Sequence, residues 1–386
     1  MAKITIPLFK VFMSEDVIKP VNDVLLSGYV GQGPKVEEFE AALAGFFGNP
    51  NLVTVNSATS ALQLSAYLLK QPGAMGDDWP GIQTGDEVLT SALTCTATNW
   101  ALLANGLKLK WVDVDPETCN LDLDDLERKI TPTTKLIAAV HWGGYPNDLD
   151  RIKEIQNRAK EAVGFAPVLI EDSAHAFGTR YKGELLGNHG NFSAFSFQAI
   201  KHFTTGDGGV LVLPGEAQKK RAKLLRWYGI DREAEGKDDF RCEDDIAEWG
   251  FKFHMNDINA TIGLYNLPHA QQCIDGFKAN TAYFDQQLAD VDGVTLMRRD
   301  DWAESACWIH TIKVENRADF MKHMESNGIM VSRVHERNDK HSCVAEFAAP
   351  LPNLDQLVEE MICIPNGWWV SEEDREFIAD CIKKGW

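Results

Sequence analysis

The chain has 386 residues with 38 Lys and Arg against 57 Asp and Glu, which gives a formal net charge of −19 at pH 7. Hydrophobic residues make up 44% and charged residues 25%, values that exclude a disordered chain or a fibre. The acid excess argues against nucleic acid and anionic membranes as partners, because both need dense basic clusters. A small anionic ligand stays compatible, since it needs only a local positive site.

The first residues, MAKITIPLFKVFMSED, do not have the pattern of a signal peptide, and no apolar run reaches the length that spans a bilayer. The eight cysteines are scattered without a CxxC pair, which predicts reduced thiols. We therefore expect a cytoplasmic protein.

Short apolar runs alternate with segments of helical periodicity through the first two-thirds of the chain. Near-continuous apolar strands separated by helices predict a mostly parallel mixed sheet covered on both faces. In chain order, we expect a helix over 36–43, a strand over 51–55, a helix over 57–69, strands over 87–90, 107–112 and 136–140, a helix over 148–162, and strands over 168–170, 192–197 and 209–213.

The last third of the chain has a different pattern. A long helical region over 255–288, with a break expected at Pro268, precedes a strand over 308–314. Helices are expected over 318–327, 354–361 and 372–383. We divide the chain into a large α/β domain, residues 1–265, and a smaller α+β C-terminal domain, residues 266–386.

Three segments contain the residues with the clearest chemistry. In the first, VTVNSATSALQL (53–64), a strand ends and a helix opens at Ser57, Ala58 and Thr59. Free backbone N–H groups and the positive end of the dipole at a helix amino terminus bind phosphate. The alternative is that Asn56 or Ser57 only caps the helix.

The second segment, APVLIEDSAHAFG (166–178), places Asp172 just past an apolar strand. Open α/β sheets bind ligands at the carboxyl ends of their strands. His175 follows across a turn of small residues. The two residues are either a catalytic pair or a satisfied polar strand end, and this segment alone leaves both interpretations open.

The third segment, NFSAFSFQAIKHFTTGDGGVLV (191–212), contains Lys201 among aromatic and apolar residues. A lysine in such surroundings loses its proton more easily and can act as an amine nucleophile. The alternative is a surface lysine whose stem covers apolar area. The GDGG string lacks the spacing of a dinucleotide-binding motif and is typical of a tight turn. Together, the three segments supply the groups that a pyridoxal phosphate enzyme needs: a phosphate cradle, a carboxylate and an amine.

The sequence resembles the DegT/DnrJ/EryC1/StrS family of sugar aminotransferases, which have the type I pyridoxal phosphate-dependent (aspartate aminotransferase-like) α/β fold. The resemblance covers the large domain almost completely and the small domain more loosely. It is carried by the three segments above and by GYVGQGP (28–34), DVDPETCNLD (113–122), VHWGG (140–144) and FKFHMNDINATIG (251–263).

This resemblance implies roles for the matching residues. Lys201 would form the Schiff base with pyridoxal 5'-phosphate, Asp172 would pair with the pyridinium nitrogen, and His175 would contact the ring hydroxyl. The other cofactor-binding positions implied are Ser57, Ala58, Thr59, Ser196 and, reaching the partner subunit's cofactor, Lys252 and Asn256.

Three positions depart from the family pattern. The family usually has Gly where this chain has Ala58, and most often Asn where it has Lys252. Cys95 stands where many relatives have an aromatic residue that stacks on the cofactor ring. Either the ring packs against a smaller residue here, or Trp100 takes over that contact.

Polar residues in SRVHERNDKH (332–341) are the candidates for the acceptor site. Arg333, His335 and Arg337 either face the acceptor or form a solvated turn. The string is not HExxH, and His335 and His341 do not have the spacing of a helical metal pair. We therefore expect no metal.

The resemblance implies a ping-pong transamination within a homodimer that shares its active sites. Glutamate would donate the amino group, pyridoxamine 5'-phosphate would carry it, and a nucleoside-diphosphate keto sugar would accept it. In most relatives this acceptor is a 6-deoxy sugar with its keto group at C4 or C3, and we take the 4-keto sugar as the first candidate. Two alternatives stay open: a pyridoxamine phosphate-dependent sugar 3-dehydratase, in which relatives have His at the position of Lys201, and a non-catalytic sensor of the same fold.

Overall fold

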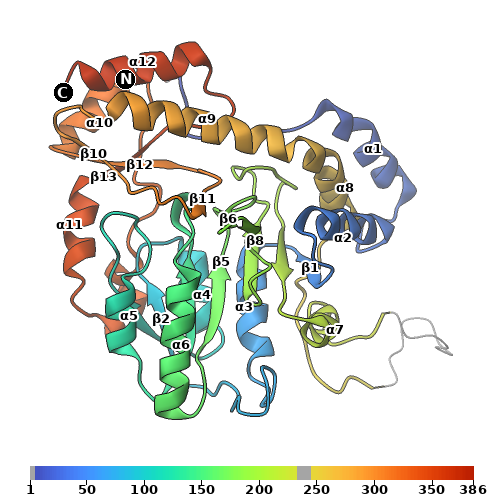
Figure 1. The fold of residues 1–386 in the computed structure, drawn as a ribbon. Coiled ribbons are helices and arrows are strands. Elements are labelled where there is room, and N and C mark those ends of the chain that lie inside the picture. The colour runs from blue at the N-terminus through green and yellow to red at the C-terminus, as the bar shows by residue number, and fades with distance from the viewer. Residues whose placement is uncertain (1–4, 233–244) are drawn as a thin grey trace.

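The computed structural model describes residues 5–232 and 245–386, and a seven-stranded sheet lies at its centre (Figure 1). The strand order is β1-β9-β8-β5-β4-β2-β3. The strands are β1 (Leu52–Val55), β2 (Glu87–Ser91), β3 (Lys108–Val112), β4 (Thr134–Val140), β5 (Val168–Asp172), β8 (Phe192–Ser196) and β9 (Gly209–Val212).

The predicted mostly parallel mixed sheet is confirmed. Strands β3, β2, β4, β5 and β8 pair in parallel with their neighbours, whereas β9 pairs antiparallel with both β8 and β1. Consecutive residues of a strand pack in the hydrophobic cores on opposite faces of the sheet, because side chains alternate between the two faces. Leu169 packs in the core of one face and Ile170 in the core of the other. Burial on both sides explains why these strands are apolar throughout.

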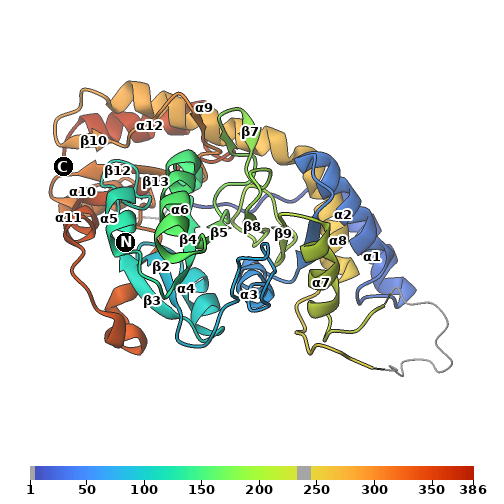
Figure 2. The same ribbon diagram turned by 60° about the horizontal axis from the view of Figure 1, so that its bottom comes forward.

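Helices cover both faces of this sheet (Figure 2). Helices α3 (Ala58–Leu68) and α4 (Thr96–Leu103) lie on one face, and α5 (Leu123–Lys129) and α6 (Leu149–Val163) lie on the other. Both α5 and α6 begin where an aspartate side chain accepts backbone N–H groups, at Asp122 and Asp148. Three further helices lie at the β1 end of the sheet: α1 (Ile18–Ser27), α2 (Pro34–Phe47) and α7 (Glu216–Leu225).

The long helical region is broken as the sequence predicts. Helix α8 (Asp257–Asn266) and helix α9 (Ala270–Leu288) are separated by a 3-10 turn over Leu267–His269, which contains Pro268. Helix α9 then runs across the top of the molecule (Figure 1).

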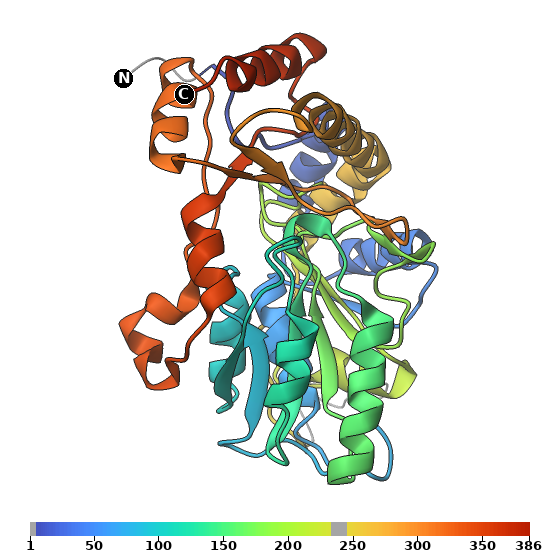
Figure 3. The ribbon, with the colours of Figure 1, turned by 60° about the vertical axis from the view of Figure 1, so that its left-hand side comes forward.

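A second, antiparallel sheet has the order β10-β12-β13 (Val294–Leu296, His310–Val314 and Met361–Ile364). It packs with α9, α10 (Arg317–Ser326) and α12 (Glu372–Lys383), while α11 (Pro352–Glu360) descends along the side of the large sheet (Figure 3). Ile6 joins this core through a bridge to Ile329, and the C-terminus lies here as well. We propose that the large domain ends at residue 265 and that the small domain begins at residue 266. A third, short sheet joins β6 (Arg180–Tyr181), β7 (Glu184–Leu185) and β11 (Ala303–Glu304).

Candidate active site

Lys201 lies in the turn that follows β8, where its backbone N–H donates to the Gln198 carbonyl at 3.0 Å. Burial lowers the pKa of Lys201 to about 7, although the carboxylate of Asp172 and the thiol of Cys95 act in the opposite direction. An amine with such a pKa is substantially unprotonated near neutral pH and can act as a nucleophile or a base. The burial of Lys201 therefore accounts for an amine that can act as a nucleophile or a base, as the sequence predicts.

Asp172 is the last residue of β5 and is 4% exposed. Its two carboxylate oxygens are held separately: Thr98 Oγ1 donates to Oδ2 at 2.5 Å, and the Ala174 N–H donates to Oδ1 at 3.1 Å. Thr98 comes from α4, which packs on the face of the sheet. No local motif marks Thr98, because its contact with Asp172 exists only after α4 has packed on β5.

The amino terminus of α3 shows that the cap and the phosphate-binding interpretations are compatible. Ser57 Oγ accepts the Ser60 N–H at 3.1 Å, which confirms the cap. Within the described residues, the N–H groups of Ala58 and Thr59 have no acceptor, so both stay free for an anion. A Cβ on Gly209 would lie 2.7 Å from the Ala58 nitrogen, which explains the glycine at this close approach.

Two histidines from distant parts of the chain meet beside Lys201. The rings of His175 and His335 are stacked with centroids 5.5 Å apart, and their Nε2 atoms are 3.5 Å apart. Burial lowers the pKa of both, to about 4 for His335, and the charge of Lys201 contributes in the same direction. Both imidazoles are therefore neutral near pH 7. The Nδ1 atom of His175 is buried and, in the part of the chain that the structure describes, has no hydrogen-bond partner.

The two arginines near His335 are engaged elsewhere. Arg337 is 5% exposed and binds the carboxylates of Asp339, at 2.6 Å, and Asp355. Arg333 forms an ion pair with Glu336 at 2.7 Å. Of the three residues that the sequence analysis proposed for the acceptor, His335 is the one that contacts His175.

Cys95 and Trp100, the two alternatives for the contact with the cofactor ring, have different neighbours in the structure. Cys95 precedes the first residue of α4 and lies within electrostatic range of Lys201. Trp100, further along the same helix, instead packs edge-on against His341 with centroids 5.9 Å apart. Of these two residues, Cys95 is the one whose charge acts on the pKa of Lys201.

Three other predicted cofactor residues lie at chain turns near these elements. Ser196 ends β8, and its Oγ accepts the Gln198 N–H at 3.3 Å. Asn256 caps α8 by accepting the Asn259 N–H at 2.9 Å. Lys252 Nζ lies 4.6 Å from the ring centre of Trp227. Their roles toward a cofactor stay proposals.

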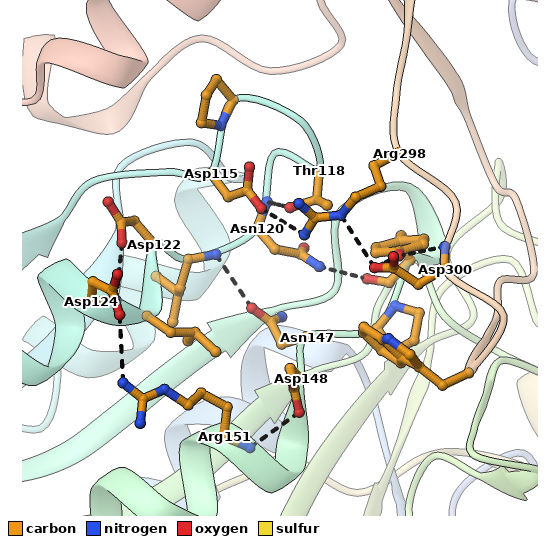
Figure 4. A pocket seen from close by; sticks show the side chains of 16 residues that line it. Asp115, Thr118, Asn120, Asp122, Asp124, Asn147, Asp148, Arg151, Arg298 and Asp300 are labelled. Atoms are coloured by element: carbon orange, nitrogen blue, oxygen red, sulfur yellow. Dashed lines mark hydrogen bonds and ion pairs between the residues drawn. The ribbon is translucent and has the colours of Figure 1, made fainter.

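A cavity of about 580 Å³ is lined by residues other than those of the candidate active site (Figure 4). It is lined by the loops after β3 and β4 and by the segment from Arg298 to Trp302, and neither Lys201 nor Asp172 borders it. Arg298 binds Asp115 at 2.9 Å and Asp300 at 3.2 Å. The charges in this cavity are thus largely satisfied within the chain.

Among residues 5–232 and 245–386, no group of three or more His, Cys, Asp or Glu side chains is arranged to hold a metal ion. In the same residues, no helix is long and apolar enough to cross a membrane.

The groups present fit pyridoxal phosphate. Among residues 5–232 and 245–386, the Nδ1 atom of His175 and two N–H groups of α3 have no hydrogen-bond partner, and the amine of Lys201 lies close by. A cofactor that brings a phosphate, a ring hydroxyl and a carbonyl would supply partners for these groups. Carboxyl ends of parallel strands are also where this class of sheet binds its ligands.

Fold and site therefore define a type I pyridoxal phosphate-dependent aminotransferase. Residues 12–383 match the DegT/DnrJ/EryC1/StrS aminotransferase family, and the chain belongs to that family. It is similar to AtS13 from Actinomadura melliaura, with 48% identity, full coverage of both chains and a TM-score of 0.94. The sugar aminotransferase CalS13 from Micromonospora echinospora is 44% identical over 99% of this chain and 100% of that chain, with a TM-score of 0.93. Spr1654 from Streptococcus pneumoniae, solved in PLP and PMP forms, is 26% identical over 98% of each chain, with TM-scores of 0.85 and 0.87.

Proposed function

We propose that this aminotransferase transfers the amino group of L-glutamate to the keto group of a nucleotide-linked sugar, a 4-keto-6-deoxy sugar being the first candidate. The observation that carries the proposal is the Lys201 amine, whose pKa is lowered to about 7 by burial, beside the carboxylate of Asp172. The similarity to CalS13, which is a sugar aminotransferase, supports a sugar acceptor.

Each residue of the site has a distinct task in this proposal. When bound, pyridoxal phosphate supplies a carbonyl carbon that carries the amino group and a ring that accepts electrons. The N–H groups of Ala58 and Thr59 bind the phosphate, and Asp172 stabilises positive charge on the ring nitrogen. Lys201, as a free amine, takes the proton from the donor's Cα and returns one to the cofactor carbon that receives the amino group.

The two histidines contribute as neutral groups. Because burial lowers the pKa of His175 and His335, neither adds a positive charge that would repel protons from Lys201. A neutral imidazole donates one hydrogen bond and accepts another. His175 is proposed to donate to the ring hydroxyl, and His335 to contact the acceptor sugar.

We further propose a homodimer in which Lys252 and Asn256 reach the partner's cofactor phosphate. Apolar side chains of the amino-terminal region support an association surface: Ile18 is 71%, Leu26 79% and Tyr29 78% exposed. Exposed apolar groups of this size gather where proteins associate.

The test incubates the purified protein with ¹⁵N-glutamate and a set of nucleotide keto sugars. Label retained in an amino sugar supports transamination, whereas deoxygenation without label supports the 3-dehydratase. Failure to bind pyridoxal phosphate, seen as no visible absorbance band, would support the sensor. Lys201→Ala is expected to abolish turnover, and Lys322→Ala, on the exposed surface of α10, is the matched control.

A further inference from the structure

Trp308 is a fully buried tryptophan that contacts the turn containing Lys201. It is 1% exposed and precedes the first residues of β12. Its Nε1–H donates to the carbonyl of Ile200 at 2.9 Å, and Phe9 stacks on it with centroids 5.2 Å apart and an interplanar angle of 18°. A hydrogen bond at the edge and a ring against one face fix the plane of the indole.

The ammonium of Lys201 lies against this indole. Lys201 Nζ is 3.4 Å from the Trp308 ring centre, well within the range of a cation–π contact. Among the described residues, no hydrogen-bond acceptor lies within bonding distance of Nζ, so the aromatic face is its close polar partner. The same indole contacts His175, with centroids 4.1 Å apart.

We propose that Trp308 is a positioning residue for Lys201, which holds the amine against its indole face and ties the preceding turn through its N–H. The proposal rests on the proposed function, in which Lys201 is the catalytic amine. Trp308 belongs to the segment that leads into the β10-β12-β13 sheet, whereas Lys201 lies in the turn after β8 of the seven-stranded sheet. A residue next to the smaller sheet therefore orients the reactive amine next to the larger one. No motif in the sequence marks this role.

Burial and the indole of Trp308 shift the pKa of Lys201 in opposite directions. Burial disfavours the charged form of Lys201, whereas the negative face of an indole favours it. Removing the aromatic face while keeping an apolar side chain should therefore lower the pKa of Lys201 further. If Trp308 instead acted only as a wall against water, its loss would admit water and raise the pKa.

The experiment measures this pKa in the cofactor-free, full-length protein. Lys201 is labelled with trace acetic anhydride at a series of pH values, and the extent of labelling is read by peptide mass spectrometry. In Trp308→Leu, the midpoint of Lys201 labelling is expected to fall by about 0.5–1.5 pH units relative to wild type. Trp308→Phe, which keeps a weaker aromatic face, should fall by less, and it replaces the leucine variant if that variant does not fold.

The matched control is Trp369→Leu, which removes a tryptophan that hydrogen-bonds to the Pro7 carbonyl rather than to the Lys201 turn. Its labelling midpoint should equal that of the wild type. A midpoint that is unchanged in both Trp308 variants, or that rises toward the ordinary value of lysine, would overturn the proposal. Retained transamination in Lys201→Ala would overturn the proposed function instead, so the two failures are distinguishable.

Discussion

Replacing Lys201 by Met tests whether a buried amine with a low pKa is present before any cofactor binds. The pKa of Lys201 is lowered from 10.5 to about 7 by burial. Between these two values the unfolded chain binds more protons than the folded one. The stability of the cofactor-free protein should therefore rise with pH across this window, and the contribution of Lys201 should be flat below about pH 6, where both states carry the proton.

The size of the effect follows from the two pKa values. One unit of pKa shift corresponds to about 1.4 kcal/mol of differential stability. With the folded pKa near 7 and half of the amine still protonated there, raising the pH from 7 to 9 should stabilise the wild type by about 2 kcal/mol relative to Lys201→Met. At pH 7 the buried charge costs the wild type about 4 kcal/mol by the same relation.

The assay is urea unfolding of the cofactor-free proteins at pH 6, 7, 8 and 9, at fixed ionic strength and protein concentration. The difference between wild type and variant is the quantity of interest, because it cancels all groups that titrate alike in both. Lys322→Met, at an exposed position, should give a difference that does not change with pH. A pH-independent difference for Lys201→Met, or one that falls from pH 7 to 9, would refute the lowered pKa.

Three further outcomes are expected. Thr98→Val removes the hydroxyl that donates to the Asp172 carboxylate, the proposed partner of the ring nitrogen, and should lower kcat about 10- to 100-fold, measured with the amino donor under saturation. Arg337→Met should lower the free energy of unfolding by about 3 kcal/mol in urea titrations, because it leaves the carboxylate of Asp339, whose side chain is only 11% exposed, without its partner. Gly209→Ala places a Cβ 2.7 Å from the Ala58 nitrogen and should weaken pyridoxal phosphate binding at least about tenfold by absorbance titration; unchanged affinity would contradict the role of the α3 terminus.

The central sheet could be predicted from the sequence because burial on both faces makes its strands continuous apolar runs. The break at Pro268 was predictable for a similar reason, since proline cannot continue a helix. The predicted strand over 308–314, however, begins only at His310, where pairing with Ile364 starts. Trp308 precedes the ladder, and its indole N–H donates to the Ile200 carbonyl.

The proposed catalytic residues divide in the same way. Asp172 ends the apolar strand β5, and Lys201 lies in the turn five residues after β8, so their positions at the sheet edge could be inferred from the residues before them. Thr98 and Trp308 could not be found like this, because each contacts the site through the packing of a helix or a loop that is distant in sequence. The local sequence pattern identifies residues that lie at the end of a strand. The residues that hold those side chains in place can be identified only from the tertiary structure.

The net charge of −19 shows why that local environment matters. A strongly acidic protein as a whole favours protonated amines and repels anions. Lys201 nevertheless has a lowered pKa, and the leading cause is burial rather than a neighbouring cation. Interactions between exposed charges are screened by salt over about 10 Å at 0.1 M, whereas desolvation is not. The reactivity of the amine should therefore depend little on ionic strength, and phosphate binding should depend on the α3 terminus rather than on the field of the whole molecule.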